Sequence, residues 1–210
     1  NVIHMTTGTS GCPVGTALWS YVWADQHDLA FIGNTIDGAL DPAFTATAFP
    51  SGGYPAILVW ARNPHAATLT NLVIANNEIS VTGTAPRIAL MDTATGEIAS
   101  ATIAVNSFTA TDPAVSTDPP GRNVNSRPVA ARLDATDNWW GAATGPTTGQ
   151  ATGNVDTSHW IGTFTPGTRT PGFWPEDVVL RTSLSDSGGS ASIELVDPNG
   201  AWHIDFDFTG

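Results

Sequence analysis

The sequence contains no lysine, and this absence is the first constraint on possible partners. All seven basic residues are arginines, against nineteen aspartates and glutamates, so the formal net charge is −12 and the pI is about 4.4. A chain this acidic offers no basic patch to a nucleic acid or to an anionic membrane surface. The composition therefore argues against both partner classes, whereas divalent cations would be tolerated.

Cysteine and long apolar runs are also scarce. Cys12 is the only cysteine, so no intramolecular disulfide is available, and its neighbours Gly11 and Pro13 predict a loop. No run reaches the roughly 18 apolar residues of a membrane span. The segment at Asn1 has neither the charged nor the apolar region of a signal peptide. We therefore expect a mature secreted or cell-surface form, or a portion of a longer chain.

Charged residues make up only 12% of the chain, about half of what soluble domains carry. Hydrophobic residues reach 41%, enough for 210 residues to bury a sizeable core. The polar surface must then consist of Thr, Ser, Asn and Gly, which favours strands and turns over helices. No segment shows a convincing 3.6-residue period, so helices should be few and short.

A short pattern recurs four times and organises the chain. In each copy an apolar residue is followed two positions later by another small or large apolar residue, by Asn at the fifth step and by a large apolar residue at the seventh. The copies begin 43, 29 and 32 residues apart, at Leu29, Leu72, Ala101 and Leu133. A fixed local pattern with variable spacing predicts stacked coils whose strands align while their loops differ in length.

Each copy predicts one inward strand face and one turn. Alternation at period two places Leu29, Phe31, Leu72, Ile74 and Ile103 on the interior face. Asn tolerates left-handed backbone geometry and bonds to neighbouring backbone groups at a turn. The pattern therefore predicts a hydrogen-bonded ladder of stacked side chains, namely Asn34, Asn77, Asn106 and Asn138.

A second strand precedes each of the first three copies. These strands cover 17–23, 56–60 and 87–91, and glycines and prolines flank them. Long inserted loops are expected over 39–55 and 109–128. The fold class predicted from this pattern is all-β, a parallel β-helix (solenoid) of about four coils.

The stretch Asp137-Asn138-Trp139-Trp140-Gly141, with Gly145-Pro146 and then Val155-Asp156…Trp160-Ile161, is distinctive. It resembles the closing coil of secreted right-handed parallel β-helix repeat proteins, the pectate-lyase-like superfamily. The resemblance covers roughly 29–161 and implies a right-handed solenoid. It implies no single activity, because such proteins include lyases, hydrolases, epimerases, tailspikes and adhesins.

The chain departs from that family in having only about four coils and no amphipathic helix to cover the first coil. Either 1–28 forms an unusual cap, or a missing N-terminal portion or another subunit stacks there end to end. After Ile161 the pattern changes, and strands are predicted over 178–184, 192–196 and 202–208 with a turn at 197–200. We therefore expect a β-helix domain over 1–165 and a small antiparallel β appendage over 166–210 that covers the last coil.

Charged residues follow the leading strands and suggest one site. Asp25, Arg62 and Asp92 should stack on neighbouring coils, and Arg132 and Asp134 would continue the column in the fourth. Such an array could bind Ca²⁺ through Asp25 and Asp92 and use Arg62 or Arg132 as a base, as lyases of the resembled superfamily do. A salt-bridge ladder, in which Arg62 neutralises both aspartates, is the interpretation that we favour.

Other catalytic patterns are missing or weak. The family's hydrolase pattern needs Gly-His-Gly and Arg-x-Lys elements, which the chain lacks. The five histidines are scattered without metal-ligand spacing. His27 and His65 lie near the same predicted sheet edge as the charged column, and we interpret them as turn residues.

Aromatic residues alternate along the first leading strand. Trp19, Tyr21 and Trp23 share one strand face, with Trp60 on the next coil. Pointing outward, they would form a sugar-stacking platform; pointing inward, they would form core. Both orientations fit the sequence, and the inward one is favoured.

These observations predict an extracellular or cell-surface β-helix module with a structural, adhesive or glycan-contacting role, and no required cofactor. The absence of a complete catalytic constellation and the small number of coils motivate this hypothesis. The alternative is a polysaccharide-active enzyme, in the first place a Ca²⁺-assisted lyase using Arg62 or Arg132 with Asp25, Asp92 and Asp134. End-to-end self-association and contact with a polysaccharide or cell-surface glycan are the expected partnerships.

Overall fold

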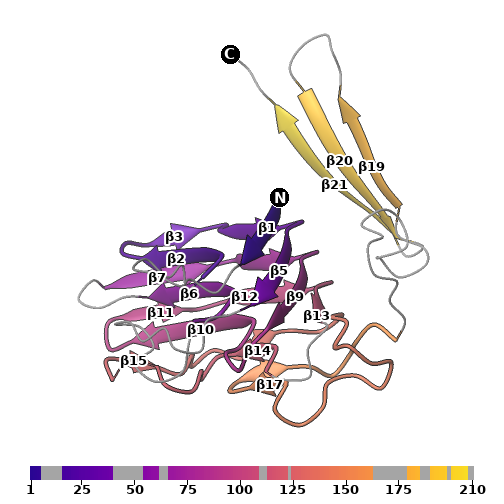
Figure 1. The fold of residues 1–210 in the computed structure, drawn as a ribbon. Coiled ribbons are helices and arrows are strands. Elements are labelled where there is room, and N and C mark those ends of the chain that lie inside the picture. Colours follow the sequence, from indigo (N-terminus) through magenta and orange to yellow (C-terminus); the bar gives the residue numbers. More distant parts are fainter. Residues whose placement is uncertain are drawn as a thin grey trace. The chain divides into compact units, whose positions relative to one another are not determined.

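The structure, a computed structural model, describes residues 1–5, 16–39, 54–61, 66–108, 113–122 and 124–162, together with three strand segments at 179–184, 190–197 and 200–207 (Figure 1). The chain forms two compact units, Asn1–Thr163 and Phe164–Gly210. The sequence-based prediction puts this boundary between 165 and 166. Cys12 and the loop 40–53 lie outside the described residues.

The first unit is all-β, and none of its described residues is helical. Three successive sets of four strands follow the sequence, and each strand pairs in parallel with the strand of the same rank in the next set. The sets are β2 (Leu18–Val22), β3 (Gln26–His27), β4 (Ala30–Ile32) and β5 (Thr35–Ala39); then β6 (Ile57–Ala61), β7 (Ala67–Thr70), β8 (Leu72–Ala75) and β9 (Glu78–Thr82); then β10 (Ile88–Thr93), β11 (Gly96–Ile98), β12 (Ala101–Ala104) and β13 (Ser107–Phe108).

Shorter strands extend the sheets that these sets begin. β1 (Val2–Met5) pairs with β5, β14 (Val115–Ser116) and β17 (Ala151–Thr152) continue the β10 sheet, and β16 (Leu133–Asp134) and β18 (Val155–Asp156) continue the β12 sheet. β15 (Ser126–Arg127) pairs antiparallel with β10. The predicted parallel, stacked β-structure is thereby confirmed, and it is consistent with a β-solenoid. Among the residues described, no helix has the length and apolarity needed to cross a membrane.

The core lies inside the stack, on the strand faces that the alternation predicts. Leu72, Ile74 and Ile103 are completely buried, and Leu29 and Phe31 pack against the same core while staying partly exposed. Register explains the stacking, because Phe31 pairs with Ile74 and Ile74 with Ile103 across adjacent strands. The predicted interior face is confirmed.

The asparagine ladder is also confirmed. Each of the first three asparagines donates twice, from its backbone N–H and its Nδ2, to the Oδ1 of the next one along. For Asn34 and Asn77 these distances are 3.0 and 2.8 Å, and for Asn77 and Asn106 they are 3.0 and 2.9 Å. Asn106 and Asn138 repeat the pattern at 2.8 and 3.0 Å. All four side chains are buried, so every rung satisfies polar groups that water cannot reach.

The ladder turn differs from the prediction in one respect. The positive φ angles belong to the residues that precede the asparagines, Gly33, Asn76, Val105 and Asp137, at 67°, 53°, 56° and 55°. The asparagine side chain therefore pairs with its neighbour, while the residue before it makes the sharp turn. Val105 is the unusual member, because a β-branched residue is strained in the left-handed region.

The closing motif ends the ladder. Trp140 is buried against Phe108, with ring centroids 5.3 Å apart. Trp160 forms a bridge with Asn138, so an indole stands where a further asparagine would continue the series. The Trp160 ring lies against Gly145, where an added Cβ would come within 2.5 Å of ring atoms. The motif thus fits a chain position where repetition stops.

The second unit contains an antiparallel sheet of three strands in the order β19 (Val179–Leu184), β20 (Ser190–Asp197) and β21 (Gly200–Asp207). Asp197 pairs with Gly200, which is where the predicted turn lies. The antiparallel character of this region is confirmed. Its covering of the last coil stays a prediction.

Candidate functional site

The outer face of β2 and the residue directly after it carry aromatic side chains, which we call the aromatic row: Trp19, Tyr21 and Trp23. Trp19 and Trp23 are 54% and 48% exposed, and Tyr21 is half-buried. Leu18 and Val22 occupy the opposite face and contact the core. The favoured inward orientation of the aromatics was therefore wrong, because strand alternation allows only one of the two sets inside.

The aromatic row continues onto the neighbouring strand through Trp60. The rings of Trp19 and Tyr21 lie 4.6 Å apart at 35°, and those of Tyr21 and Trp60 lie 5.5 Å apart at 72°. Trp60 is only 4% exposed and belongs to a second apolar cluster with Leu58 and Met91. Trp60 therefore packs beside Tyr21, its partner across the β2–β6 pair, and offers little surface of its own.

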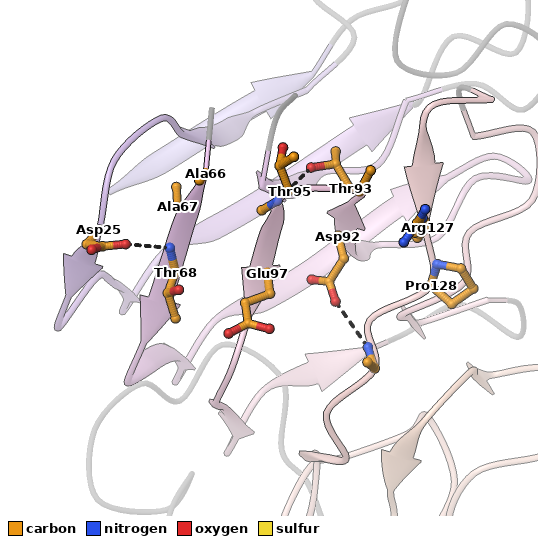
Figure 2. Close-up of a pocket in the computed structure, with 13 residues that line it drawn as sticks. Asp25, Ala66, Ala67, Thr68, Asp92, Thr93, Thr95, Glu97, Arg127 and Pro128 are labelled. Atoms are coloured by element: carbon orange, nitrogen blue, oxygen red, sulfur yellow. Dashed lines mark hydrogen bonds between the residues drawn. The ribbon is translucent and has the colours of Figure 1, made fainter. Parts of the chain in front are cut away.

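A pocket of about 450 Å³ lies where the leading strands end (Figure 2). We call it the acidic pocket, because Asp25, Asp92 and Glu97 line it, and Arg127 is its only basic residue among those described. In Figure 2, Glu97 and Asp92 lie between Asp25 and Arg127. Asp25 follows the aromatic row two residues after Trp23, so the row and the pocket adjoin along the chain.

Asp92 lines the acidic pocket and holds two segments together. It is 5% exposed, and its two carboxylate oxygens accept hydrogen bonds from the backbone N–H of Ile98 at 2.8 Å and of Ala130 at 3.1 Å. Burial raises the pKa of this carboxyl above its ordinary value; the two backbone bonds oppose the rise and the charge of Glu97 adds to it. Asp92 is therefore primarily a structural group.

The other pocket carboxylates are more accessible. Asp25 Oδ1 accepts the Thr68 N–H at 2.9 Å, and Glu97 is exposed on β11. Within the described residues, no group of three or more His, Cys, Asp or Glu side chains is arranged to hold a metal ion. The pocket thus presents negative charge toward solvent.

The predicted charged column is only partly brought together. Asp25 and Asp92 share the acidic pocket, whereas Arg62 lies outside the described residues. Asp134 lies in the β16 sheet, in register with Thr102 and Asp156, and does not stack on Asp92. That part of the prediction was wrong, because the fourth leading strand is β14, which carries no charge.

Arg132 is not among the residues that line the acidic pocket, and it pairs with Asp156. Its guanidinium lies 3.0 Å from the Asp156 carboxylate. Hydrogen bonds from Ser158 are the main reason that the pKa of Asp156 is lowered, and Arg132 contributes to this shift. His27, on β3, hydrogen-bonds Thr70 on β7, and His4, on β1, pairs with Asp37 on β5, so both histidines join neighbouring strands. The interpretation of His27 as a turn residue was therefore wrong. His65 lies outside the described residues.

Sequence reasoning missed three relevant residues. Asn1 donates to Asn34 Oδ1 at 2.9 Å and adds a rung to the ladder. Its Asn-x-Ile spacing matches that of Asn34 and could have revealed it. Glu97 and Arg127 offered no such signal, since their meeting at the pocket depends on the antiparallel pairing of β15 with β10.

Comparisons with protein-family models, with curated proteins and with solved structures gave no match to this chain. The resemblance to pectate-lyase-like β-helix proteins therefore stays a prediction.

Proposed function

We propose that the first unit is a right-handed β-helix of about four coils that serves, outside the cell or on its surface, as a non-catalytic module contacting glycans. The observation that carries this proposal is the exposed aromatic row on the outer face of β2. Large aromatic rings are usually buried, and rings held in solvent by a paired strand mark a contact surface.

The aromatic row suits a sugar chain for two reasons. The C–H-rich faces of pyranose rings pack on the faces of aromatic rings, and Trp offers the largest such face. The row is also held in place, because β2 pairs along its whole length with β6 and Tyr21 packs on the buried Trp60. A fixed platform loses little conformational entropy on binding.

The structural part of the proposal is supported by the stack itself. Parallel strands and a buried ladder give a stiff scaffold whose outer faces can vary without disturbing the core. The low fraction of charged residues, 12%, and the absence of lysine fit a surface of Thr, Ser and Asn that faces the extracellular medium.

The test is glycan binding by the full chain and by Trp19→Ala. Affinity for a bound oligosaccharide should fall about three- to ten-fold in the variant, because one stacking face is removed. Ile32→Ala, an exposed apolar change on β4, is the control and should bind like the wild type. Unchanged binding by Trp19→Ala, or no binding of any neutral, acidic or amino glycan by the wild type, contradicts the proposal.

A calcium-assisted polysaccharide lyase is the second candidate. The observation in its favour is that Asp25, Asp92 and Glu97 line the same pocket as Arg127, so that carboxylates and a guanidinium meet. Carboxylate oxygens suit Ca²⁺, and an arginine can act as the base that removes a proton beside a uronate carboxyl. Unsaturated products that require Ca²⁺ and disappear in Arg127→Gln would establish the lyase in place of the non-catalytic module.

A further inference from the structure

We infer that the aromatic row discriminates among glycans by charge, disfavouring polyanionic chains and accepting neutral and cationic ones. This inference rests on the proposed function, since it concerns the ligand class of the same surface. It adds a direction of selectivity that the aromatic rings alone cannot supply, because a ring face stacks on charged and uncharged sugars alike.

The first step is the position of the acidic pocket. Asp25 lies two residues beyond Trp23, with a bend at Ala24 between them, so the two residues are at most about 7 Å apart along the chain. A sugar chain that covers the aromatic row and extends past Trp23 therefore comes near Asp25, one of the residues that line the pocket. This separation is within about one screening length at physiological ionic strength, roughly 8 Å, so such a ligand is exposed to the charge of Asp25.

The second step is the sign and the balance of the charge. Three carboxylates line the pocket against one guanidinium, that of Arg127. The net charge of the whole chain, −12, adds to the same negative field. Glu97 also helps to raise the pKa of Asp92, because the two negative charges repel each other. A further negative charge is disfavoured here, and a positive one is favoured.

The third step is that two of the pocket charges can be removed without disturbing the structure of the pocket. Glu97 is exposed, and no hydrogen bond or ion pair joins its carboxylate to another described residue. Asp25 accepts one backbone hydrogen bond, which an Asn side chain can also accept through its Oδ1. Both charges can therefore be removed by isosteric amides with the pocket intact. Asp92 is left unchanged because it holds Ile98 and Ala130.

The experiment measures binding of three oligosaccharides of equal length by the full chain, in a weakly acidic buffer with EDTA. The probes are oligomers of galacturonic acid, of N-acetylglucosamine and of glucosamine, which are anionic, neutral and cationic. Affinity should rise in that order. Each removed carboxylate should change the affinity for a charged probe by about two- to five-fold. In the double variant Asp25→Asn/Glu97→Gln, the affinities for the anionic and the cationic probe should therefore both approach the affinity for the neutral probe.

Added salt gives a second readout of opposite sign for the two charged probes. Screening should strengthen binding of the anionic oligomer and weaken that of the cationic one. Glu78→Gln, on β9 and away from the pocket lining, is the matched control and should leave the order unchanged.

The outcomes separate the two proposals. Equal affinity for all three probes, or an order that the double variant leaves intact, overturns the charge selectivity while the glycan-contacting function stands if Trp19→Ala still weakens binding. Binding of none of the probes overturns the selectivity together with the function on which it rests. Anionic binding that appears only when Ca²⁺ replaces EDTA also overturns it and supports the lyase.

Discussion

Two corners of the first unit are built on opposite plans. At the ladder corner, every set of strands contributes the same residue, and Asn34, Asn77, Asn106 and Asn138 repeat one another's hydrogen bonds. At the pocket corner, β2 is followed by Asp25 and β10 includes Asp92, a residue with its own partners in Ile98 and Ala130. Repetition makes the scaffold, and departure from repetition makes the candidate site.

The largest effect should come from interrupting the ladder. Asn106→Ala removes the acceptor of two donors on Asn77 and the donor to the Ile74 carbonyl, all of them buried. Because unpartnered buried polar groups cost about 1–3 kcal/mol each, we expect the free energy of unfolding to fall by about 3–5 kcal/mol. Urea unfolding followed by tryptophan fluorescence measures this.

The matched control for that experiment is Asn154→Ala, which removes a single exposed hydrogen bond to the Ala130 carbonyl. It should lower the free energy of unfolding by less than about 1 kcal/mol. If the two variants lose the same stability, the ladder is no more important than an ordinary surface contact.

The next effect concerns Asp92 at the pocket corner. Asp92→Ala leaves the N–H groups of Ile98 and Ala130 without their acceptor, and we expect a loss of about 2 kcal/mol at neutral pH. Thermal unfolding of the variant beside Asn106→Ala compares the two corners directly. A loss equal to that of Asn106→Ala would mean that the pocket corner contributes as much to stability as the ladder corner.

The pH dependence of Asp92 sharpens this comparison, because the ladder has no titratable group. The pKa of Asp92 is raised in the folded state above 3.8, so the folded chain binds the proton more tightly than the unfolded chain. The stability from this group is then fully present below 3.8 and is lost as pH rises through the raised value. Relative to Asp92→Asn, the wild type should gain stability when the pH is lowered through that window. A constant difference across the window would contradict the shift.

A smaller effect, of opposite sign, is expected at Val105. This residue holds a φ of 56° directly before Asn106, and Asn76 occupies the equivalent place one coil earlier. Val105→Asn should raise the free energy of unfolding by about 1 kcal/mol, since Asn tolerates the left-handed region better. Asn76→Val is the reciprocal variant and should lose a similar amount in the same urea titration. Equal stability of both variants and the wild type would show that the turn carries no strain.

The smallest effect should be that of Asp25→Asn. Its side chain keeps the acceptor for the Thr68 N–H and loses only an accessible charge, so stability should change by less than about 0.5 kcal/mol. Thermal unfolding checks this, with Thr68→Pro, which lacks the N–H, as the disruptive counterpart. A large loss in Asp25→Asn would mean that the charge is structural.

The contrast between the corners also explains what could be predicted from the sequence. The Asn spacing and the alternation of Leu72 and Ile74 are local patterns repeated in every coil, so the parallel stack and its ladder were accessible. The orientation of Trp19 and Tyr21 was not, because a strand with large apolar residues on both faces fits either way. The acidic pocket could not be predicted for another reason. Arg127 reaches it through an antiparallel strand pairing that leaves no repeated pattern in the sequence.

In the ladder the asparagines bond to one another only between adjacent coils, and this has a consequence for local opening of the native chain. Every rung joins residues 29, 32, 33 or 43 positions apart, so each coil is coupled only to its immediate neighbours. The amide protons of Asn77 and Asn106, held between buried rungs on both sides, should be the slowest in the ladder to exchange with deuterated solvent. Exchange should proceed inward from the first and last rungs, and its rates would record the order in which the coils separate.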